Sequence, residues 1–240
     1  MVFALVSALT VGITQLARVL PGLGAYVQLL VGGVFLMAAV RLARREPGGM
    51  RRIGIDLAGL LTPPDANDER PAGPLGIYDL GRALRAAAPS GAKESLVALG
   101  VAAVVFPPFV LGFHAWYAPS AAFELRFPDE LGAFVLTQLI VVALPEEAFF
   151  RGYVQTRLSD RFTGEGWRIR IDPRVWLLQA ALFAVIHLAS DLNPAKLAVF
   201  FPALLFGLVR AWRGGIGAAM LLHALSNVLA AVLEASWQIR

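Results

Sequence analysis

The 240-residue chain contains no cysteine, and only 16% of its residues are charged. The lack of cysteine excludes disulfides, thiolate-ligated metal sites and a cysteine nucleophile. A soluble domain is typically about 25% charged and about 45–50% apolar. Here 58% of the residues are hydrophobic and the mean hydropathy is +0.66. These values predict an all-α, polytopic membrane helical bundle.

The chain is basic, with a formal net charge of +4 and an isoelectric point near 10.0. Its basic residues gather beside apolar runs and do not alternate with aromatic residues. That arrangement is typical of cytoplasmic loops that face anionic lipid. We therefore expect the lipid bilayer as a partner and no nucleic acid.

Seven apolar runs approach the length of about 20 residues that a transmembrane helix needs. The first lacks a basic leading region and a clear cleavage site, which favours an uncleaved span over a signal peptide. With seven spans, all the basic loops fall on one side, so the positive-inside rule puts the N-terminus inside and the C-terminus outside. The predicted spans are 2–19, 23–40, 95–113, 131–158, 175–189, 197–212 and 214–233.

Residues 41–93 form a long loop, predicted to be cytoplasmic, that is rich in proline and glycine. Within it, residues 75–87 carry apolar side chains at helical spacing together with Arg82 and Arg85. This pattern fits a short helix in the membrane interface, and it fits a partly ordered surface loop equally well. We see no internal repeat and no second domain.

Glu146 and Glu147 end a long apolar run that only Thr137 and Gln138 interrupt. An ionised glutamate in hydrocarbon costs at least about 2.5–3.5 kcal/mol, so the pair needs partners. Arg151 lies four residues beyond Glu147, where a salt bridge is natural on a helix. One carboxylate is then left without a local partner. It could act as a general base, although a purely structural ion pair is the alternative interpretation.

Three further polar residues interrupt later apolar runs. His187 lies near the end of the fifth run, and His223 and Asn227 share one face of the seventh because they are four residues apart. Such a pair can present two donors to a developing oxyanion, or it can simply hydrogen-bond between helices. At about 1.5 Å per residue, these three and Glu146 all lie about 14–20 Å from the cytoplasmic ends of their spans. His114, at the outer edge of the third run, is assigned a structural or interfacial role.

Three motifs thus follow one another along the chain: Glu-Glu-x-x-x-Arg at 146–151, Phe-x-x-x-His at 183–187 and His-x-x-x-Asn at 223–227. In this order, on the fourth, fifth and seventh predicted spans, they resemble the CPBP family, also called the Abi family. It comprises the CAAX prenyl endopeptidases and bacteriocin-processing enzymes. The resemblance covers residues 131–233, which it marks as the catalytic core of a single membrane domain, 1–240. It does not cover the first two spans or the loop 41–93.

The resemblance implies a glutamic-type intramembrane endopeptidase. Glu146 would be the base that activates a water molecule, and His187 would help to hold that water. His223 and Asn227 would form the oxyanion site. Every motif position is present, so the chain is expected to be catalytically competent.

Glu147 and Arg151 would orient the reacting groups and balance their charge. No cofactor and no metal are implied. Two histidines and a glutamate are also zinc-type ligands, so a zinc-dependent version of the protease is an alternative. The chain contains no His-Glu-x-x-His motif, which is typical of zinc proteases. The two histidines and the glutamate would also have to come from three different helices. Metal-free chemistry is therefore favoured.

The expected substrate is a membrane-anchored protein or peptide. The bias towards alanine, glycine and arginine suggests a high-GC bacterium, hence a multi-pass protein of the bacterial inner membrane. Bacterial relatives include a myxosortase-like branch that removes C-terminal sorting tags, and the segment around the glutamate pair is compatible with it. Two rivals stay open: a non-catalytic scaffold or immunity-type protein, and a proton-coupled transporter. No pair of half-length or Gly-Pro-broken helices supports the transporter.

Overall fold

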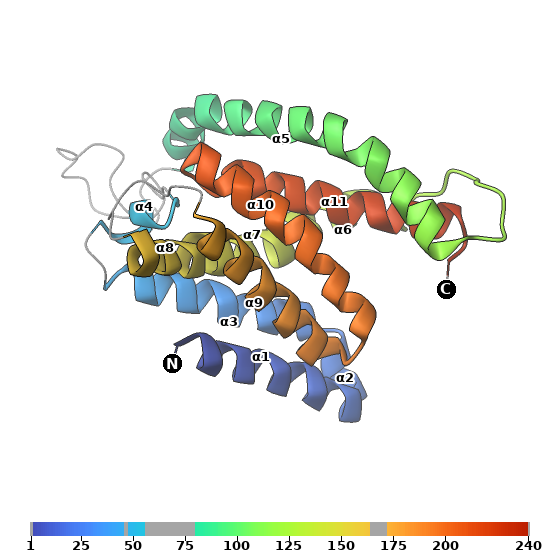
Figure 1. The fold of residues 1–240 in the computed structure, drawn as a ribbon, viewed down its shortest axis with the longest axis horizontal. Helices are drawn as coiled ribbons and strands as arrows, with labels where there is room; N and C mark the ends of the chain where they lie inside the picture. The colour runs from blue at the N-terminus through green and yellow to red at the C-terminus, as the bar shows by residue number, and fades with distance from the viewer. Residues whose placement is uncertain (1, 46–47, 56–79, 164–171, 240) are drawn as a thin grey trace.

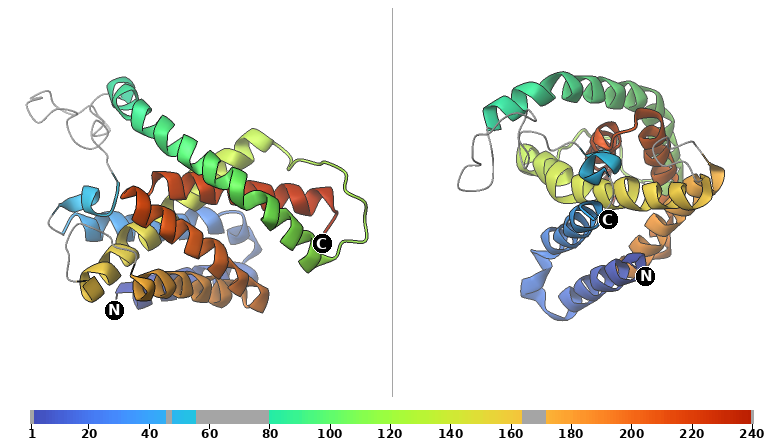
Figure 2. Two further views of the ribbon diagram at one scale, coloured as in Figure 1. Left: turned by 45° about the horizontal axis from the view of Figure 1, so that its top comes forward. Right: turned by 90° about the vertical axis from the view of Figure 1, so that its left-hand side faces the viewer.

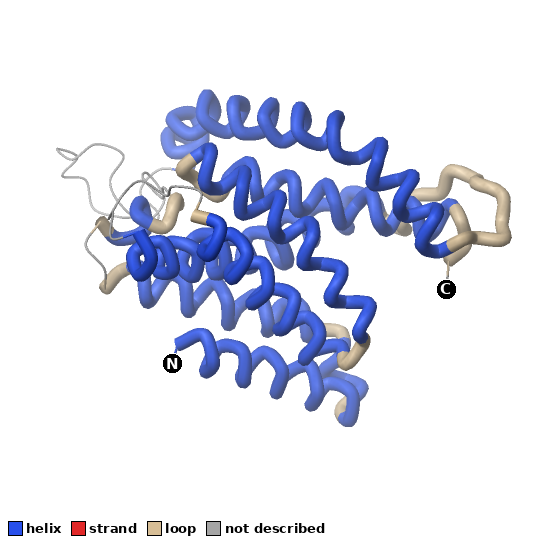
Figure 3. The backbone as a smooth tube through the Cα atoms, in the orientation of Figure 1, coloured by secondary structure: helices blue, strands red, loops and turns tan. Residues whose placement is uncertain are grey.

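Helices account for all the regular structure that the computed structural model describes, which covers residues 2–45, 48–55, 80–163 and 172–239. Within those residues there is no strand (Figures 1 and 3). This confirms the predicted all-α bundle. The elements are α1 (Val2–Val19), α2 (Pro21–Gly24), α3 (Val27–Ala43), α4 (Gly49–Arg52), α5 (Leu80–Tyr117), α6 (Leu131–Leu136), η1 (Thr137–Ala143), α7 (Leu144–Glu147), η2 (Ala148–Val154), α8 (Gln155–Thr163), α9 (Pro173–Asp191), η3 (Pro194–Val199), α10 (Phe200–Arg213) and α11 (Gly217–Ser236).

Every predicted span corresponds to a helix. Among the described residues, 6 helices are long and apolar enough to cross a membrane, and Val27–Ala43 is apolar but shorter, at 17 residues. The elements from α6 to α8 join into one helix, Leu131–Phe162, of 32 residues. A helix of that length exceeds one bilayer crossing, as expected for the span that carries the glutamate pair. The chain is a multi-pass membrane protein.

The third predicted span is much longer in the structure. Instead of a separate interfacial helix and a span at 95–113, α5 runs unbroken from Leu80 to Tyr117. The residues between the two predicted segments include Pro89 and Gly91, the two weakest helix formers, so intrinsic propensity does not explain the continuation. Residues 75–79 of the predicted interfacial helix lie outside the described part of the chain. The helix passes through Pro107 and Pro108 and is curved (Figures 1 and 2).

Local chemistry sets several helix ends. The Asp172 side chain accepts a hydrogen bond from the backbone amide of Arg174 and so caps α9, which has Pro173 at its first position. Hydrogen bonds from Arg174 lower the pKa of the Asp172 carboxyl to about 2. Gly214 adopts φ +76° and ends α10, so α11 begins at Gly217, three residues later than predicted.

The two ends of the bundle differ as the charge pattern predicts. The N-terminus, α4, the end of α8 and the turn between α10 and α11 lie at one end, and the C-terminus lies at the other (Figure 1). Apart from the N-terminus, these segments carry basic residues. The positive-inside rule therefore predicts that this end faces the cytoplasm.

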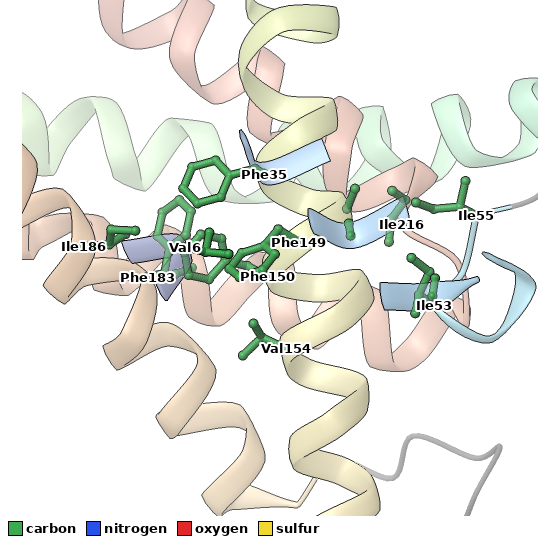
Figure 4. Close-up of a cluster of buried hydrophobic side chains, with 14 of the residues drawn as sticks. Val6, Phe35, Ile53, Ile55, Phe149, Phe150, Val154, Phe183, Ile186 and Ile216 are labelled. Carbon is green, nitrogen blue, oxygen red and sulfur yellow. The ribbon is translucent and has the colours of Figure 1, made fainter. Parts of the chain in front are cut away.

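The helix Leu131–Phe162 lies at the centre of the packing. It contacts α3 on one side and α11 on another, while α5 covers α11 and α1 packs on α3 and α9 (Figure 2). An aromatic cluster fills the interior between these helices (Figure 4). The ring centroids of Phe35 and Phe149 are 5.3 Å apart, and those of Phe150 and Phe183 are 4.9 Å apart. This cluster surrounds the helix turn that precedes Arg151.

Candidate active site

The glutamate pair lies between two π-helical turns, η1 and η2. In both, backbone amides reach back five residues: Leu144 bonds the carbonyl of Leu139, and Gln155 bonds that of Phe150. Pro145 contributes to the first, because it has no amide hydrogen to continue α-helical bonding. Single π-helical turns inside an α-helix are frequent at functional sites. The wide turns set the rotation of Glu146 and Glu147 relative to the rest of the helix.

Glu147 is completely buried and serves two donors with one oxygen. Its Oε1 accepts a hydrogen bond from Nη1 of Arg151 at 2.8 Å and one from Nδ1 of His223 at 2.9 Å. The first contact is the salt bridge expected from the i, i+4 spacing. The second joins this helix to α11. Charge-assisted hydrogen bonds of this kind are the strong ones, so Glu147 fixes the ring orientation of His223.

Arg151 is completely buried as well. Besides Glu147, it donates from Nη2 to the carbonyl of Ala203 on α10 at 3.3 Å. Its guanidinium lies over the ring of Phe183, 4.4 Å from the centroid, and 5.3 Å from that of Phe206. Aromatic faces stabilise a desolvated cation. Arg151 thus connects three helices around the glutamate pair.

Glu146 points to two imidazoles. Its Oε2 lies 3.9 Å from Nε2 of His187 and 3.8 Å from Nε2 of His223. This oxygen is buried and has no hydrogen-bond partner. Both distances exceed a direct hydrogen bond, and a gap of this size between polar atoms suits a bridging water.

The free nitrogens of both imidazoles face Glu146. Nδ1 of His187 lies 2.9 Å from the carbonyl oxygen of Phe183, which can only accept, so this nitrogen carries the proton. Nδ1 of His223 likewise donates to the carboxylate of Glu147. In the neutral rings, Nε2 is therefore an acceptor in each case. His223 can donate from Nε2 only in its imidazolium form.

His223 is held between aromatic rings. Phe206 stacks on it at 4.9 Å with an interplanar angle of 18°, and Phe183 meets it edge-on at 6.1 Å. Phe183 also contacts the ring of His187 at 4.3 Å. One phenylalanine thus touches both imidazoles and Arg151. The predicted Phe-x-x-x-His motif supplies this ring.

Asn227 lies one turn beyond His223 on α11, as its spacing predicts. Its Nδ2 donates to Oε1 of Gln138 on η1 at 2.9 Å. Gln138 is buried. In the sequence, Gln138 is one of two polar interruptions in an apolar run, and that interruption is the signal for its role. The contact leaves the second amide hydrogen of Asn227 available.

The structure brings Glu146, Glu147, His187 and His223 into one cluster, with Arg151 bound to it. Asn227 lies on the same helix face as His223 and pairs with Gln138, which was not among the predicted site residues. His114 is separate from this cluster and lies 5.1 Å from the ring of Trp237, near the end of α11. Within the described ranges, no group of three or more histidine, cysteine, aspartate or glutamate side chains is arranged to hold a metal ion.

A buried carboxylate–imidazole centre inside a polytopic helical bundle defines a narrow class of membrane protein. The family described as type II CAAX prenyl endopeptidase Rce1-like matches residues 128–229. That segment contains all six predicted site residues and is similar to this family, in agreement with the resemblance seen in the sequence. No curated protein and no solved structure matches the chain. The family is one of proteases, which supports a CAAX-type intramembrane peptidase at the level of the family.

Proposed function

We propose that this protein is a glutamic-type intramembrane endopeptidase in which Glu146 activates a water molecule. One observation carries the proposal. The unpartnered Oε2 of Glu146 lies 3.8 and 3.9 Å from the acceptor nitrogens of two imidazoles that come from two other helices. Three acceptors that face one point inside a membrane protein need a shared donor, and water is the donor that fits.

The water would donate one hydrogen to Glu146 and the other to Nε2 of His187. This orientation leaves an oxygen lone pair free to attack a scissile carbonyl carbon. As the C–O bond forms, Glu146 takes the proton, and as the C–N bond breaks, the proton passes to the leaving amine. Proton transfer by a positioned carboxylate typically contributes about 10²–10⁴-fold in rate.

The developing oxyanion would be stabilised from α11. For this step His223 would take up a proton from bulk water at Nε2; the resulting imidazolium donates from Nε2 to the oxyanion while its Nδ1 hydrogen stays bonded to the Glu147 carboxylate. Asn227 donates with the amide hydrogen that Gln138 does not use. Removing one such donor typically costs about 10²–10³-fold in turnover.

Glu147 and Arg151 position the other groups. Glu147 orients the ring of His223, and Arg151 balances the charge of Glu147 at 2.8 Å. The contacts of both residues run to each other, to His223 and to the carbonyl of Ala203. They would support the reaction without touching the substrate.

The substrate we propose is a membrane-anchored protein or peptide cleaved close to its membrane segment. A C-terminal sorting tag, with an apolar span and a basic tail, is the form that the myxosortase-like branch would process. The proposed location is the inner membrane of a bacterium. These choices rest on the membrane setting of the site and on composition.

The test compares full-length wild type with E146Q in proteoliposomes. Two probes are used: a farnesylated CAAX peptide, and a reporter with an apolar C-terminal span and a basic tail. Mass spectrometry detects the products, and membranes of cells that express each variant are searched for new protein termini. We expect E146Q to lose cleavage by at least about 10²-fold. E234Q, at an exposed glutamate on α11, is the matched control and should cleave like wild type.

The rivals predict other results. A scaffold or immunity-type protein keeps its cellular function in E146Q, and cleavage that persists in E146Q contradicts the proposed base. A transporter moves solute across the same proteoliposomes without cutting either probe. Loss of cleavage on treatment with a chelator, restored by zinc, favours the zinc-dependent version.

A further inference from the structure

In the helix Leu131–Phe162, one backbone carbonyl at the end of η2 receives no hydrogen bond from a backbone amide of the same helix. The amide of Gln155 bonds the carbonyl of Phe150, five residues back, and α8 then continues with four-residue spacing. The amide of Thr156 consequently reaches the carbonyl of Gly152, and the carbonyl of Arg151 is skipped. A buried carbonyl without a donor is costly, so a donor must come from elsewhere in the protein.

Arg210 on α10 supplies that donor. Its Nε donates to the carbonyl oxygen of Arg151 at 3.3 Å. Arg210 is only 1% exposed, and its Nη1 has no hydrogen-bond partner. Arg151 in turn donates from its side chain to the carbonyl of Ala203 on α10. The two arginines thus link η2 and α10 in opposite directions, side chain to backbone in each case.

The segment that follows α4 closes over Arg210. Gly54 has φ +80°, and a Cβ on it would lie 2.8 Å from Cζ of Arg210. The carbonyl of Gly54 accepts a hydrogen bond from the amide of Ile216 at 3.2 Å. A Cβ on Gly152 would lie 3.0 Å from the carbonyl oxygen of Ile53. Backbone thus confines the Arg210 guanidinium on one side and packs on the end of η2.

We propose that Arg210 is a positioning residue that maintains the π-helical turn η2 and thereby the Glu147–Arg151–His223 arrangement. The expected effect of Arg210 on catalysis rests on the proposed function. Its expected effect on the shape of η2 and on the ring of His223 rests on geometry alone. Without Arg210, the skipped carbonyl is satisfied most simply if the amide of Gln155 returns to α-helical spacing. That change turns the preceding residues by about 100° relative to α8, which is one residue of an α-helix. Arg151 would then leave Glu147, and Glu147 would release the ring of His223.

The test reads the His223 ring directly. The chain has only 3 histidines, so full-length protein labelled with 15N-histidine in lipid nanodiscs gives a simple NMR spectrum. In wild type the Nδ1 hydrogen of His223 is expected to be protected, because Glu147 accepts it. In R210M we expect it to exchange with water about tenfold faster, as the loss of one hydrogen bond implies. The signals of His114 serve as an internal reference.

R213Q is the matched control. Arg213 lies one turn further along α10 and pairs with Glu94 at 2.6 Å, away from η2. Its variant removes an arginine from the same helix end and should leave the His223 signal unchanged. R210K keeps an N–H donor and should retain more of the protection than R210M. If R210M does not insert stably, R210K and R210Q give the same comparison with smaller changes in side-chain chemistry.

A protected His223 signal in R210M, or the same loss in R213Q, would overturn the inference. Peptidase assays on the same variants form a separate arm. Where cleavage is found, R210M should lower kcat about tenfold or more with KM within about twofold, because misplacement by about 1 Å costs up to about 10²-fold. A shifted His223 signal without any cleavage, even in wild type, counts against the proposed function and leaves the positioning role intact.

Discussion

Gly32 on α3 faces the carbonyl oxygen of Val141 so closely that a Cβ on Gly32 would lie 2.5 Å from that oxygen. Val141 lies four residues before Pro145, which has no amide hydrogen to offer it. A Cβ on Gly32 would also lie 3.3 Å from the Pro145 ring. The missing side chain thus lets α3 pack directly on the turn that precedes the glutamate pair. A weak Cα–H···O contact suits such an approach.

We expect G32A to destabilise the protein by about 1–3 kcal/mol, because the contact atom is backbone and cannot rotate away. The displacement should reach Glu146, which follows Pro145, and lower any peptidase activity. Thermal unfolding of the full-length protein in detergent measures the first effect. G33A is the control, because a Cβ on Gly33 meets nothing within 4 Å. Equal melting temperatures for both variants would contradict the close packing.

The buried pair Glu147–Arg151 should show strong coupling. R151M leaves Glu147 uncompensated in the membrane interior, and breaking a buried pair from one side costs about 3–5 kcal/mol. E147L should cost a similar amount, while the double variant E147L/R151M should cost much less than the sum. Chemical or thermal unfolding of the four proteins completes the double-mutant cycle.

An exposed pair provides the comparison for that cycle. Arg126 and Glu124 are 2.6 Å apart, with side chains 49% and 66% exposed. Breaking this pair with R126Q should change stability by less than about 1 kcal/mol. Additive losses for Glu147 and Arg151 would mean that their contact does not contribute to folding.

We expect Gln138 to affect turnover because it holds the side-chain amide of Asn227. Q138L removes the oxygen that accepts from Nδ2 of Asn227 at 2.9 Å and frees the amide to rotate. We expect turnover to fall by about tenfold or more with little change in KM, because the amide acts on the developing oxyanion and not on the bound substrate. T137V alters the neighbouring polar side chain at nearly constant volume and should leave turnover unchanged. If Q138L lowers the stability of the protein and leaves turnover unchanged, Gln138 has only a packing role.

Much of this architecture could be predicted from the sequence. Hydropathy located a helix for each predicted span, and six of these helices are long and apolar enough to cross a membrane. The i, i+4 spacing placed Glu147 with Arg151 and His223 with Asn227, since helix geometry is local. The continuity of α5 from Leu80 was missed, because Pro89 and Gly91 favour a break between the two predicted segments.

Contacts between helices were harder to predict. The sequence did not reveal that Glu147 would bind both Arg151 and His223, because that depends on how α11 packs on α7. The π-helical turns were also missed, since their spacing follows from tertiary packing as well as from Pro145. In the sequence, Arg210 is one of two basic residues near the end of a predicted span, and nothing there singles it out. Only the skipped carbonyl of Arg151 gives it a specific partner.

The last prediction concerns Gly207, which lies against the side-chain amide of Gln179. A Cβ on Gly207 would collide with Nε2 of Gln179 and would lie 3.4 Å from Oε1 of Gln155. Gln179 is fully buried and donates to the carbonyls of Trp176 and Ala203, so its amide has no open space to occupy. Overpacking of this kind typically costs about 1–3 kcal/mol, and we expect that loss in G207A.

A second substitution separates collision from other causes. Q179A shortens the obstructing side chain and should relieve the clash, so G207A should be less harmful in the Q179A background than in wild type. The double-mutant cycle in detergent measures this coupling as a favourable interaction between the two changes. If G207A lowers the free energy of unfolding equally in both backgrounds, the clash between Gly207 and Gln179 does not explain the loss, and the predicted close contact of α9 and α10 at this glycine is contradicted. Because Ala203 also accepts from Arg151, activity in the double variant would further report whether Gln179 supports the site.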